Sequence, residues 1–186
     1  MADRNTLVRS MHDLGLAAWF GGSLMGAIGL NGAGAAVLDD KERARVASAG
    51  WAKWTPVNAA AIGAHLIGAA ALLAANKGRV ASQKGVAANS VAKTGLTLAA
   101  LGVTAYTRVL GKKIEKAGPV PALGPTDPSS ETPDDVAKVM KQEKLAQWAI
   151  PAVTGALLVV SALQGEQQKA SEVTSGVLSR LNPFSS

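Results

Sequence analysis

His65 is the residue whose type and position most clearly suggest chemistry in this sequence. It lies deep inside a long apolar stretch, roughly 16 Å beyond Trp54 if the intervening residues are helical. An ionisable residue inside a membrane segment is a functional candidate by default. We therefore expect a polar site inside the membrane, formed by His65, Asn58, Thr97 and Thr104. Its histidine either serves a ligand, a metal or a proton, or is simply hydrogen-bonded as part of the fold.

The second histidine, His12, stands at the start of the first apolar stretch beside Asp13. We expect His12 near one membrane surface and His65 near the middle of the membrane. Two histidines at such unequal depth cannot hold one haem or one copper ion within a subunit, whereas two His65 side chains could meet across a dimer axis. The sequence therefore predicts no cofactor and no metal centre. If a metal did bind, His12 and His65 would be the candidate ligands.

The other polar residues form no recognisable catalytic arrangement. The sequence has no P-loop, no dinucleotide-binding glycine pattern, no HExxH and no Ser–His–Asp pattern. It has no cysteine, which excludes disulfides, thiolate metal sites and thiol nucleophiles. The acidic residues near 127–135 suit helix capping and solubility better than acid–base catalysis. We therefore expect a non-enzymatic protein.

Four apolar segments must position these residues. The hydrocarbon core of a bilayer takes about 20 helical residues to cross, and the segments carry almost no charge in their interiors. The chain is 48% hydrophobic and 17% charged, with the charge concentrated between the segments. These features predict an all-α integral membrane four-helix bundle in one domain, residues 1–186, with spans at about 14–30, 54–75, 88–110 and 146–163. The flanks of the first span also resemble a secretory signal peptide, which is an open alternative.

The segments between the spans are polar. Residues 38–53 suggest a surface helix that ends at a tryptophan-marked membrane interface. Residues 117–131 are rich in proline and predict a flexible loop that cannot bury a core. Residues 132–135, Thr-Pro-Asp-Asp, then signal the start of an interfacial helix before the fourth span. Residues 165–186 predict a polar tail with a short amphipathic helix.

The net charge of +6 comes from basic residues that flank the spans. Such residues contact anionic lipid headgroups and set topology. No basic surface interleaved with aromatic residues accompanies them, so nucleic acid is not an expected partner. The distribution of Lys and Arg leans slightly toward both termini outside and leaves the orientation open.

Small residues line one face of each of the first two spans. Gly15, Gly22 and Gly29 repeat every seven residues, and Gly22 and Gly26 form a GxxxG motif. The second span offers a matching row, which consists of Ala60, Ala64 and Gly68. Small residues let helix backbones approach closely in lipid. We expect these rows to pack the two spans together, or to join two copies of the chain in a homodimer.

The pattern His12-x-Leu14-x-x-x-x-Trp19-x-Gly21-Gly22 resembles the opening helix of small bacterial membrane proteins of the copper-resistance D type. The segment 12–34 is also similar to that of uncharacterised actinobacterial four-span membrane proteins. The resemblance covers about one span in four. It implies a multi-pass protein of the bacterial plasma membrane and makes His12 the candidate metal-associated position, although this sequence lacks the methionine or histidine cluster typical of copper binding.

The sequence thus predicts a membrane protein with packing chemistry and no reaction chemistry. The leading hypothesis is an accessory or scaffold subunit of a membrane complex, whose partners are the lipid bilayer and other membrane subunits or a second copy. The alternative is a carrier of a small molecule, a metal or protons centred on His65.

Overall fold

The computed structural model describes residues 6–75 and 84–166, with side chains for residues 6–75 and 88–163. This part of the chain is mostly helical (84%) and contains four long helices. The first is built from α1 (Thr6–Met25), the π-helical turn η1 (Gly26–Leu30) and α2 (Asn31–Ala35). These three continue one another because the junction residues keep right-handed helical angles. The predicted amphipathic tail falls outside the described residues.

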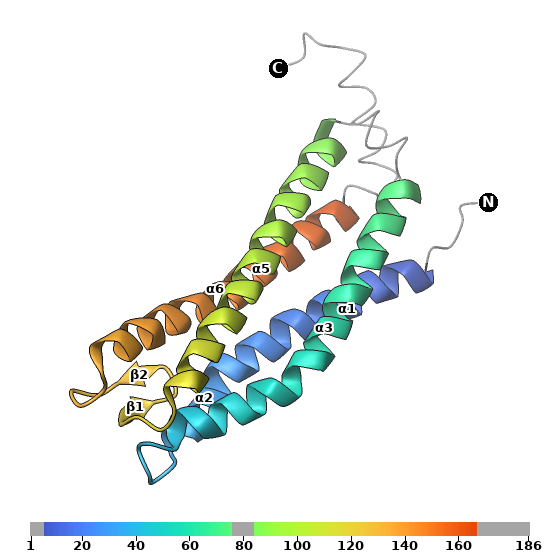
Figure 1. Cartoon of the computed structure of the whole chain (residues 1–186). Helices are drawn as coiled ribbons and strands as arrows, with labels where there is room; N and C mark the ends of the chain where they lie inside the picture. Colours follow the sequence, from blue (N-terminus) through green and yellow to red (C-terminus); the bar gives the residue numbers. More distant parts are fainter. Residues whose placement is uncertain (1–5, 76–83, 167–186) are drawn as a thin grey trace.

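The other long helices are α3 (Arg43–Ala75), α5 (Lys84–Ala117) and α6 (Asp134–Glu166). The helices pair off: α1 packs along α3, and α5 packs along α6 (Figure 1). α1 also contacts α6, which joins the two pairs, whereas α3 and α5 meet over a small area. An apolar cluster formed by Leu16, Trp19, Ala100, Ile150 and Leu157 lies where α1, α5 and α6 converge.

Three helical stretches are long and apolar enough to cross a membrane: Thr6–Ala35, Arg43–Ala75 and Asp134–Leu163. The predicted span at 88–110 lies in α5, which is not among them because polar residues such as Lys93 and Arg108 interrupt its apolar sequence. The described residues thus show three helices of membrane-crossing character, where the sequence predicts four.

Two helices extend further than the predicted spans. α3 begins at Arg43, so the predicted surface helix and the second span form one helix of 33 residues that contains Pro56. α6 begins at Asp134, so the predicted interfacial helix and the fourth span are also continuous. The glycine and proline residues in these parts lie at positions that a helix tolerates, so they do not end it.

The segment 117–131 is a folded hairpin. Strand β1 (Ala122–Gly124) pairs antiparallel with β2 (Asp127–Pro128). Val120 and Ala122 are buried against Ile114 of α5 and Met140 of α6. The prediction that this segment cannot bury apolar side chains is wrong, because the neighbouring helix ends supply the apolar surface that the segment lacks by itself.

Arg43, the first residue of α3, anchors this hairpin. Its guanidinium donates hydrogen bonds to the carbonyl oxygens of Ala122 at 2.8 Å and Leu123 at 3.2 Å, and to that of Val37 at 2.9 Å. Thr132, the predicted N-cap of α6, instead donates its hydroxyl to the carbonyl oxygen of Pro121 and accepts the amide of Ser129. The hairpin and the start of α3 therefore lie together at one end of the bundle.

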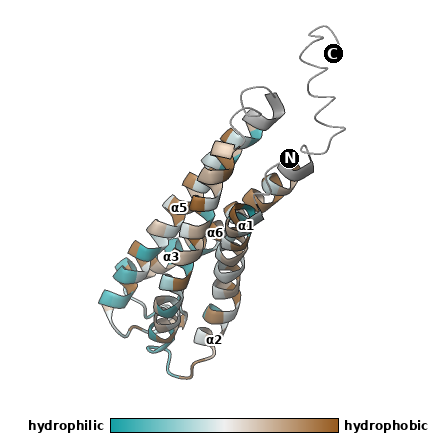
Figure 2. Cartoon of the chain, turned by 90° about the vertical axis from the view of Figure 1, so that its right-hand side faces the viewer, coloured by the Kyte–Doolittle hydropathy of each residue, from teal (hydrophilic) through white to brown (hydrophobic). Residues whose placement is uncertain are grey.

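Large apolar side chains cover the outside of the bundle. Those that are more than half exposed include Leu7, Leu14, Ile28, Ile67, Leu73, Val91, Leu98, Val109, Val159 and Leu163. Figure 2 shows hydrophilic residues gathered toward the end of the bundle that carries the hairpin. Apolar side chains spread over long helices in this way are stable in lipid, and together with the three apolar helices they indicate a membrane protein.

Candidate functional site

The two histidines meet at the contact between α1 and α3. Their imidazole rings lie with centroids 4.4 Å apart and planes tilted by 40°. Both residues are buried, with 2% of His12 and 1% of His65 exposed. Two glycines permit this approach: a Cβ atom on Gly15 would lie 2.6 Å from the backbone nitrogen of His65, and one on Gly68 would lie 2.6 Å from that of His12.

The expectation that the two histidines lie at unequal depth is wrong. The expected depth of His65 is counted from Trp54, but α3 begins eleven residues before Trp54, at Arg43. α3 also ends ten residues after His65, at Ala75, so His65 lies in the half of the helix away from the hairpin. His12 lies in the second turn of α1, at the same end. The argument from depth against a shared role of the two histidines therefore does not apply.

The hydrogen bonds of the rings define where their lone pairs lie. Nδ1 of His65 is 3.1 Å from the backbone oxygen of His12, and because a carbonyl only accepts, this nitrogen donates. Nδ1 of His12 donates in the same way to Oδ1 of Asp13 at 2.7 Å. In a neutral ring, Nε2 then carries the lone pair. Both Nε2 atoms are buried and lack a hydrogen-bond partner among the described residues.

These nitrogens border a pocket of about 310 Å³. We call it the histidine pocket; its lining includes His12, His65, Lys93, Thr97, Leu101 and Ser161. It lies between α1, α3, α5 and α6, so every long helix contributes to it. The hydroxyl oxygen of Ser161 is also buried without a partner in the described part of the chain. Water or a ligand in this pocket would complete these hydrogen bonds.

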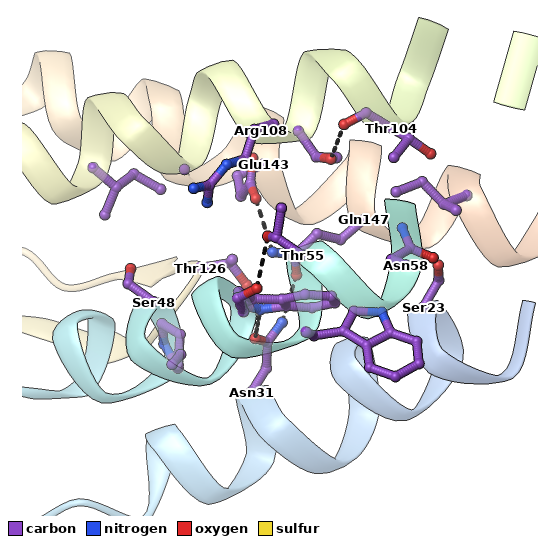
Figure 3. Close-up of a pocket in the computed structure, with 18 of the residues that line it drawn as sticks. Ser23, Asn31, Ser48, Thr55, Asn58, Thr104, Arg108, Thr126, Glu143 and Gln147 are labelled. Atoms are coloured by element: carbon purple, nitrogen blue, oxygen red, sulfur yellow. Dashed lines mark hydrogen bonds between the residues drawn. The ribbon is translucent and has the colours of Figure 1, made fainter. Parts of the chain in front are cut away.

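A second pocket, of about 340 Å³, lies nearer the hairpin. We call it the glutamate pocket; its lining includes Trp51, Trp54, Asn58, Leu101, Thr104 and Glu143 (Figure 3). Asn58 and Thr104 are thus placed here, whereas His65 and Thr97 line the histidine pocket. The structure divides the predicted polar site between two pockets, and Leu101 borders both.

Trp19 stands between the two halves of the predicted site. Its indole Nε1 donates to Oγ1 of Thr104 at 3.1 Å. Its ring lies edge-on to the ring of His65, with centroids 6.3 Å apart. Trp19 is fully buried and has both Thr104 and His65 as neighbours.

Glu143 is the candidate functional residue that sequence reasoning missed. Its carboxyl group is buried, with 5% of the residue exposed, and Oε1 accepts a hydrogen bond from Nε2 of Gln147 at 2.9 Å. Oε2 is buried without a partner among the described residues. The sequence predicts an interfacial helix at this position. The available signal was its spacing from Gln147 and Ile150, which places all three on one helical face.

The predicted packing residues differ in what they contact. Gly22 and Gly26 face tryptophan rings: a Cβ atom there would lie 2.5 Å from Cε2 of Trp54 and from Cζ2 of Trp51, respectively. Gly29 has only Met25 of its own helix within 4 Å. Of the matching row in α3, Gly68 contacts α1, Ala64 is half-buried and Ala60 is exposed. Gly15, Gly22 and Gly26 are therefore covered by α3 within one chain, and Gly29 is not.

Metal binding has limited support from the geometry. The described residues include no group of three or more His, Asp or Glu side chains that could hold a metal ion. A metal placed opposite two trans imidazoles would require ring centroids roughly 6 Å apart, since each bond from nitrogen to zinc is about 2.0 Å long. The separation of 4.4 Å leaves room for cis ligation only.

Comparison with known proteins adds no further constraint. No protein-family model matches the chain, and neither curated proteins nor solved structures give a match.

Proposed function

We propose that this chain is a non-enzymatic multi-pass protein of the bacterial plasma membrane that conducts protons through the interior of a four-span bundle. The His12–His65 pair is the proton-exchanging site. One observation carries this proposal. Six buried side-chain atoms lack a hydrogen-bond partner among the described residues, and each of them lines one of the two pockets: Nε2 of His12, Nε2 of His65, Oγ of Ser161, Nε1 of Trp54, Oδ1 of Asn58 and Oε2 of Glu143.

Such atoms inside a lipid-embedded bundle require water or a ligand, because an unpaired buried polar group is destabilising. Water and titratable side chains together form proton relays in membrane proteins. The histidine pocket has two imidazole nitrogens, and the glutamate pocket has a carboxyl group. Leu101 is a shared wall of both pockets, so one side chain lies at the boundary between them.

Four spans are supported by the place of α5. Its polar residues Lys93, Thr97 and Thr104 line the pockets, whereas Val91 and Val109 lie outside both pockets and are more than half exposed. A helix that lines polar pockets has a lower hydropathy than one that meets lipid on most sides. This explains why α5 falls short of the other three helices in hydropathy.

A proton carrier is favoured over a metal carrier because zinc sites normally use three or four protein ligands, and the described residues bring together two imidazoles. The role of accessory or scaffold subunit stays a prediction. So does the resemblance to copper-resistance D proteins.

Proton flux into liposomes tests the proposal. Purified protein is reconstituted into vesicles that contain a pH-sensitive dye, and a potassium diffusion potential drives proton entry. We expect the wild type to acidify the lumen at least about tenfold faster than His65→Ala. Tyr106→Phe serves as the control, because it removes an ionisable group that lies outside both pockets. Equal rates for protein-free vesicles and wild-type vesicles would show that the proposal is wrong.

A further inference from the structure

We propose that the glutamate pocket binds a small organic cation, a protonated amine with an apolar or aromatic body, and that Glu143 is its counter-ion. This goes beyond proton conduction and does not depend on it, since the site lies at the other side of Leu101 from the two histidines.

The carboxyl group of Glu143 is buried, and only one of its two oxygens has a hydrogen-bond partner among the described residues. A buried carboxylate is strongly destabilising unless a cation or several hydrogen bonds compensate it. Gln147 supplies one hydrogen bond to Oε1, and Oε2 has none among the described residues. The adjacent Lys144 is already paired with Asp127 at 2.5 Å. A ligand with a positively charged N–H group would satisfy the remaining oxygen.

Arg108 is the cation of the chain that also lines this pocket. Its side chain is exposed, and the described residues show no ion pair between Arg108 and Glu143. Glu115 also lines this pocket and is exposed. Glu143 is therefore the buried acidic side chain of the pocket.

A chain of hydrogen bonds fixes the carboxyl group in place (Figure 3). Nε1 of Trp51 donates to Oδ1 of Asn31 at 3.2 Å, and Nδ2 of Asn31 donates to Oε1 of Gln147 at 2.6 Å. Gln147 is thereby oriented with its amide N–H toward Glu143. The first two hydrogen bonds join α3 to α2 and α2 to α6, and the last lies within α6, so three helices help to hold the carboxyl group in one position before any ligand binds.

The walls of the pocket suit an aromatic or aliphatic ammonium ion. Trp51 and Trp54 both line it, and indole rings attract cations through their faces. Ile62 and Ile150 provide apolar surface. Oδ1 of Asn58 is a second buried acceptor without a partner in the described part of the chain. The volume of 340 Å³ lies at the lower end of the range of about 300–1,000 Å³ that is usual for small-molecule sites.

An anion or a metal ion fits this pocket less well. The buried atoms that await partners include two oxygen acceptors, on Glu143 and Asn58, and one donor, Nε1 of Trp54. An anion would meet the carboxylate without a buried cation to compensate. A metal ion would find no group of three or more acidic or histidine ligands among the described residues. A primary ammonium group donates hydrogen bonds, which is what these oxygen acceptors require.

The test measures equilibrium binding to the full-length protein in detergent. Binding is detected by the quenching of tryptophan fluorescence and by calorimetry. The probe is phenethylammonium, and 2-phenylethanol and phenylacetate serve as its neutral and anionic counterparts. We expect saturable binding of the ammonium probe, and binding at least about tenfold weaker in Glu143→Gln, because a charge-assisted hydrogen bond is lost. Glu131→Gln is the matched control, because it removes an exposed carboxyl group outside both pockets, and its affinity should stay within about twofold of the wild type.

A second variant keeps the test decisive if Glu143→Gln folds poorly. Ala105 lines the pocket from α5 and is exposed, so Ala105→Phe reduces the volume of the pocket without altering the carboxyl group. It should weaken binding of the ammonium probe by a similar factor. The proposal is wrong if phenethylammonium binds Glu143→Gln as well as the wild type, if phenylacetate binds equally well, or if no probe binds and the pocket holds water only. Proton flux is measured separately, so failure here leaves the proposed proton conduction intact.

Discussion

The imidazole ring of His12 rests against that of His65, with centroids 4.4 Å apart, at the closest approach of α1 and α3. The backbone of His12 also accepts the hydrogen bond of the His65 ring. Each histidine therefore holds the other through a ring contact and a hydrogen bond, which fixes the positions of both Nε2 atoms. Anything that separates the two helices should disturb the two rings together.

Gly68→Ala should separate them. Its Cβ atom would lie 2.6 Å from the backbone nitrogen of His12, a distance that the fold can relieve only by moving a helix. Overpacking of this kind destabilises proteins by about 1–3 kcal/mol. We expect a lower thermal unfolding midpoint in detergent, measured by circular dichroism. Gly63→Ala in the same helix has nothing within 4 Å of its Cβ atom and should be neutral or stabilising by up to about 1 kcal/mol.

If the two alanine variants unfold at the same temperature, the close contact of α1 and α3 at Gly68 is incorrect. The position of the histidine pair would then have no support.

The tryptophan contacts of α1 predict a contrast between two glycines of the predicted packing row. Gly26→Ala would place a Cβ atom 2.5 Å from Cζ2 of Trp51, whose Nε1 is held by Asn31. Moving the ring breaks that hydrogen bond, so we expect destabilisation of about 1–2 kcal/mol. Gly29→Ala meets Met25 alone, at 3.7 Å or more, and should be tolerated. Chemical unfolding followed by tryptophan fluorescence compares the two, and equal destabilisation would contradict the placement of Trp51.

Arg43→Ala should loosen the hairpin. The variant removes the donor for three carbonyl oxygens, of which two belong to the hairpin residues Ala122 and Leu123. We expect the free energy of unfolding to fall by about 2 kcal/mol. Proteolytic cleavage within residues 118–131, detected by mass spectrometry, should become faster. Arg45→Ala is the matched control. It removes an exposed ion pair with Glu42, and exposed pairs contribute little to stability, so its cleavage rate should match that of the wild type.

The helices could be predicted from hydropathy and length, because apolar stretches of about 20 residues have few other uses. The two histidines could not be paired in this way. A span that is predicted to start at Trp54 leaves out the charged residues of α3 that precede it. These residues are helical because they continue a helix whose other half is stabilised by packing. Which residues of α1 and α3 face each other depends on the contacts at Gly15 and Gly68, which fix both register and depth.

Glu143 and the hairpin were missed for a related physical reason. A lone acidic residue between lysines reads as a solvated helix face, and a proline-rich segment reads as a loop. Both are buried by other elements of the fold: Gly111 of α5 lies beside the carboxyl group of Glu143, and Ile114 and Met140 pack against the hairpin. Packing between elements cannot be read from the local composition of the covered segment.

The proposed fourth crossing, by α5, is supported by where the hairpin lies. Arg43 binds the carbonyl oxygens of Ala122 and Leu123, so the start of α3 and the hairpin share one end of the bundle. α3 leads away from that end, and α6 starts from it after Asp134. α5 must therefore carry the chain back. Its 34 residues give about 50 Å of helix, which exceeds the roughly 30 Å of a hydrocarbon core.

Single cysteines can test this directly, because the natural chain has none. Lys41→Cys and Ser130→Cys, both at exposed positions, should react with a membrane-impermeant maleimide from the same side of sealed vesicles. Thr6→Cys, at the exposed start of α1, should react from the opposite side, since α1 to α2 crosses between them. Labelling of Lys41→Cys and Ser130→Cys from opposite sides would mean that α5 does not cross. The pockets that α5 lines would then open to water, and their unpartnered atoms would need no conducted proton or bound cation.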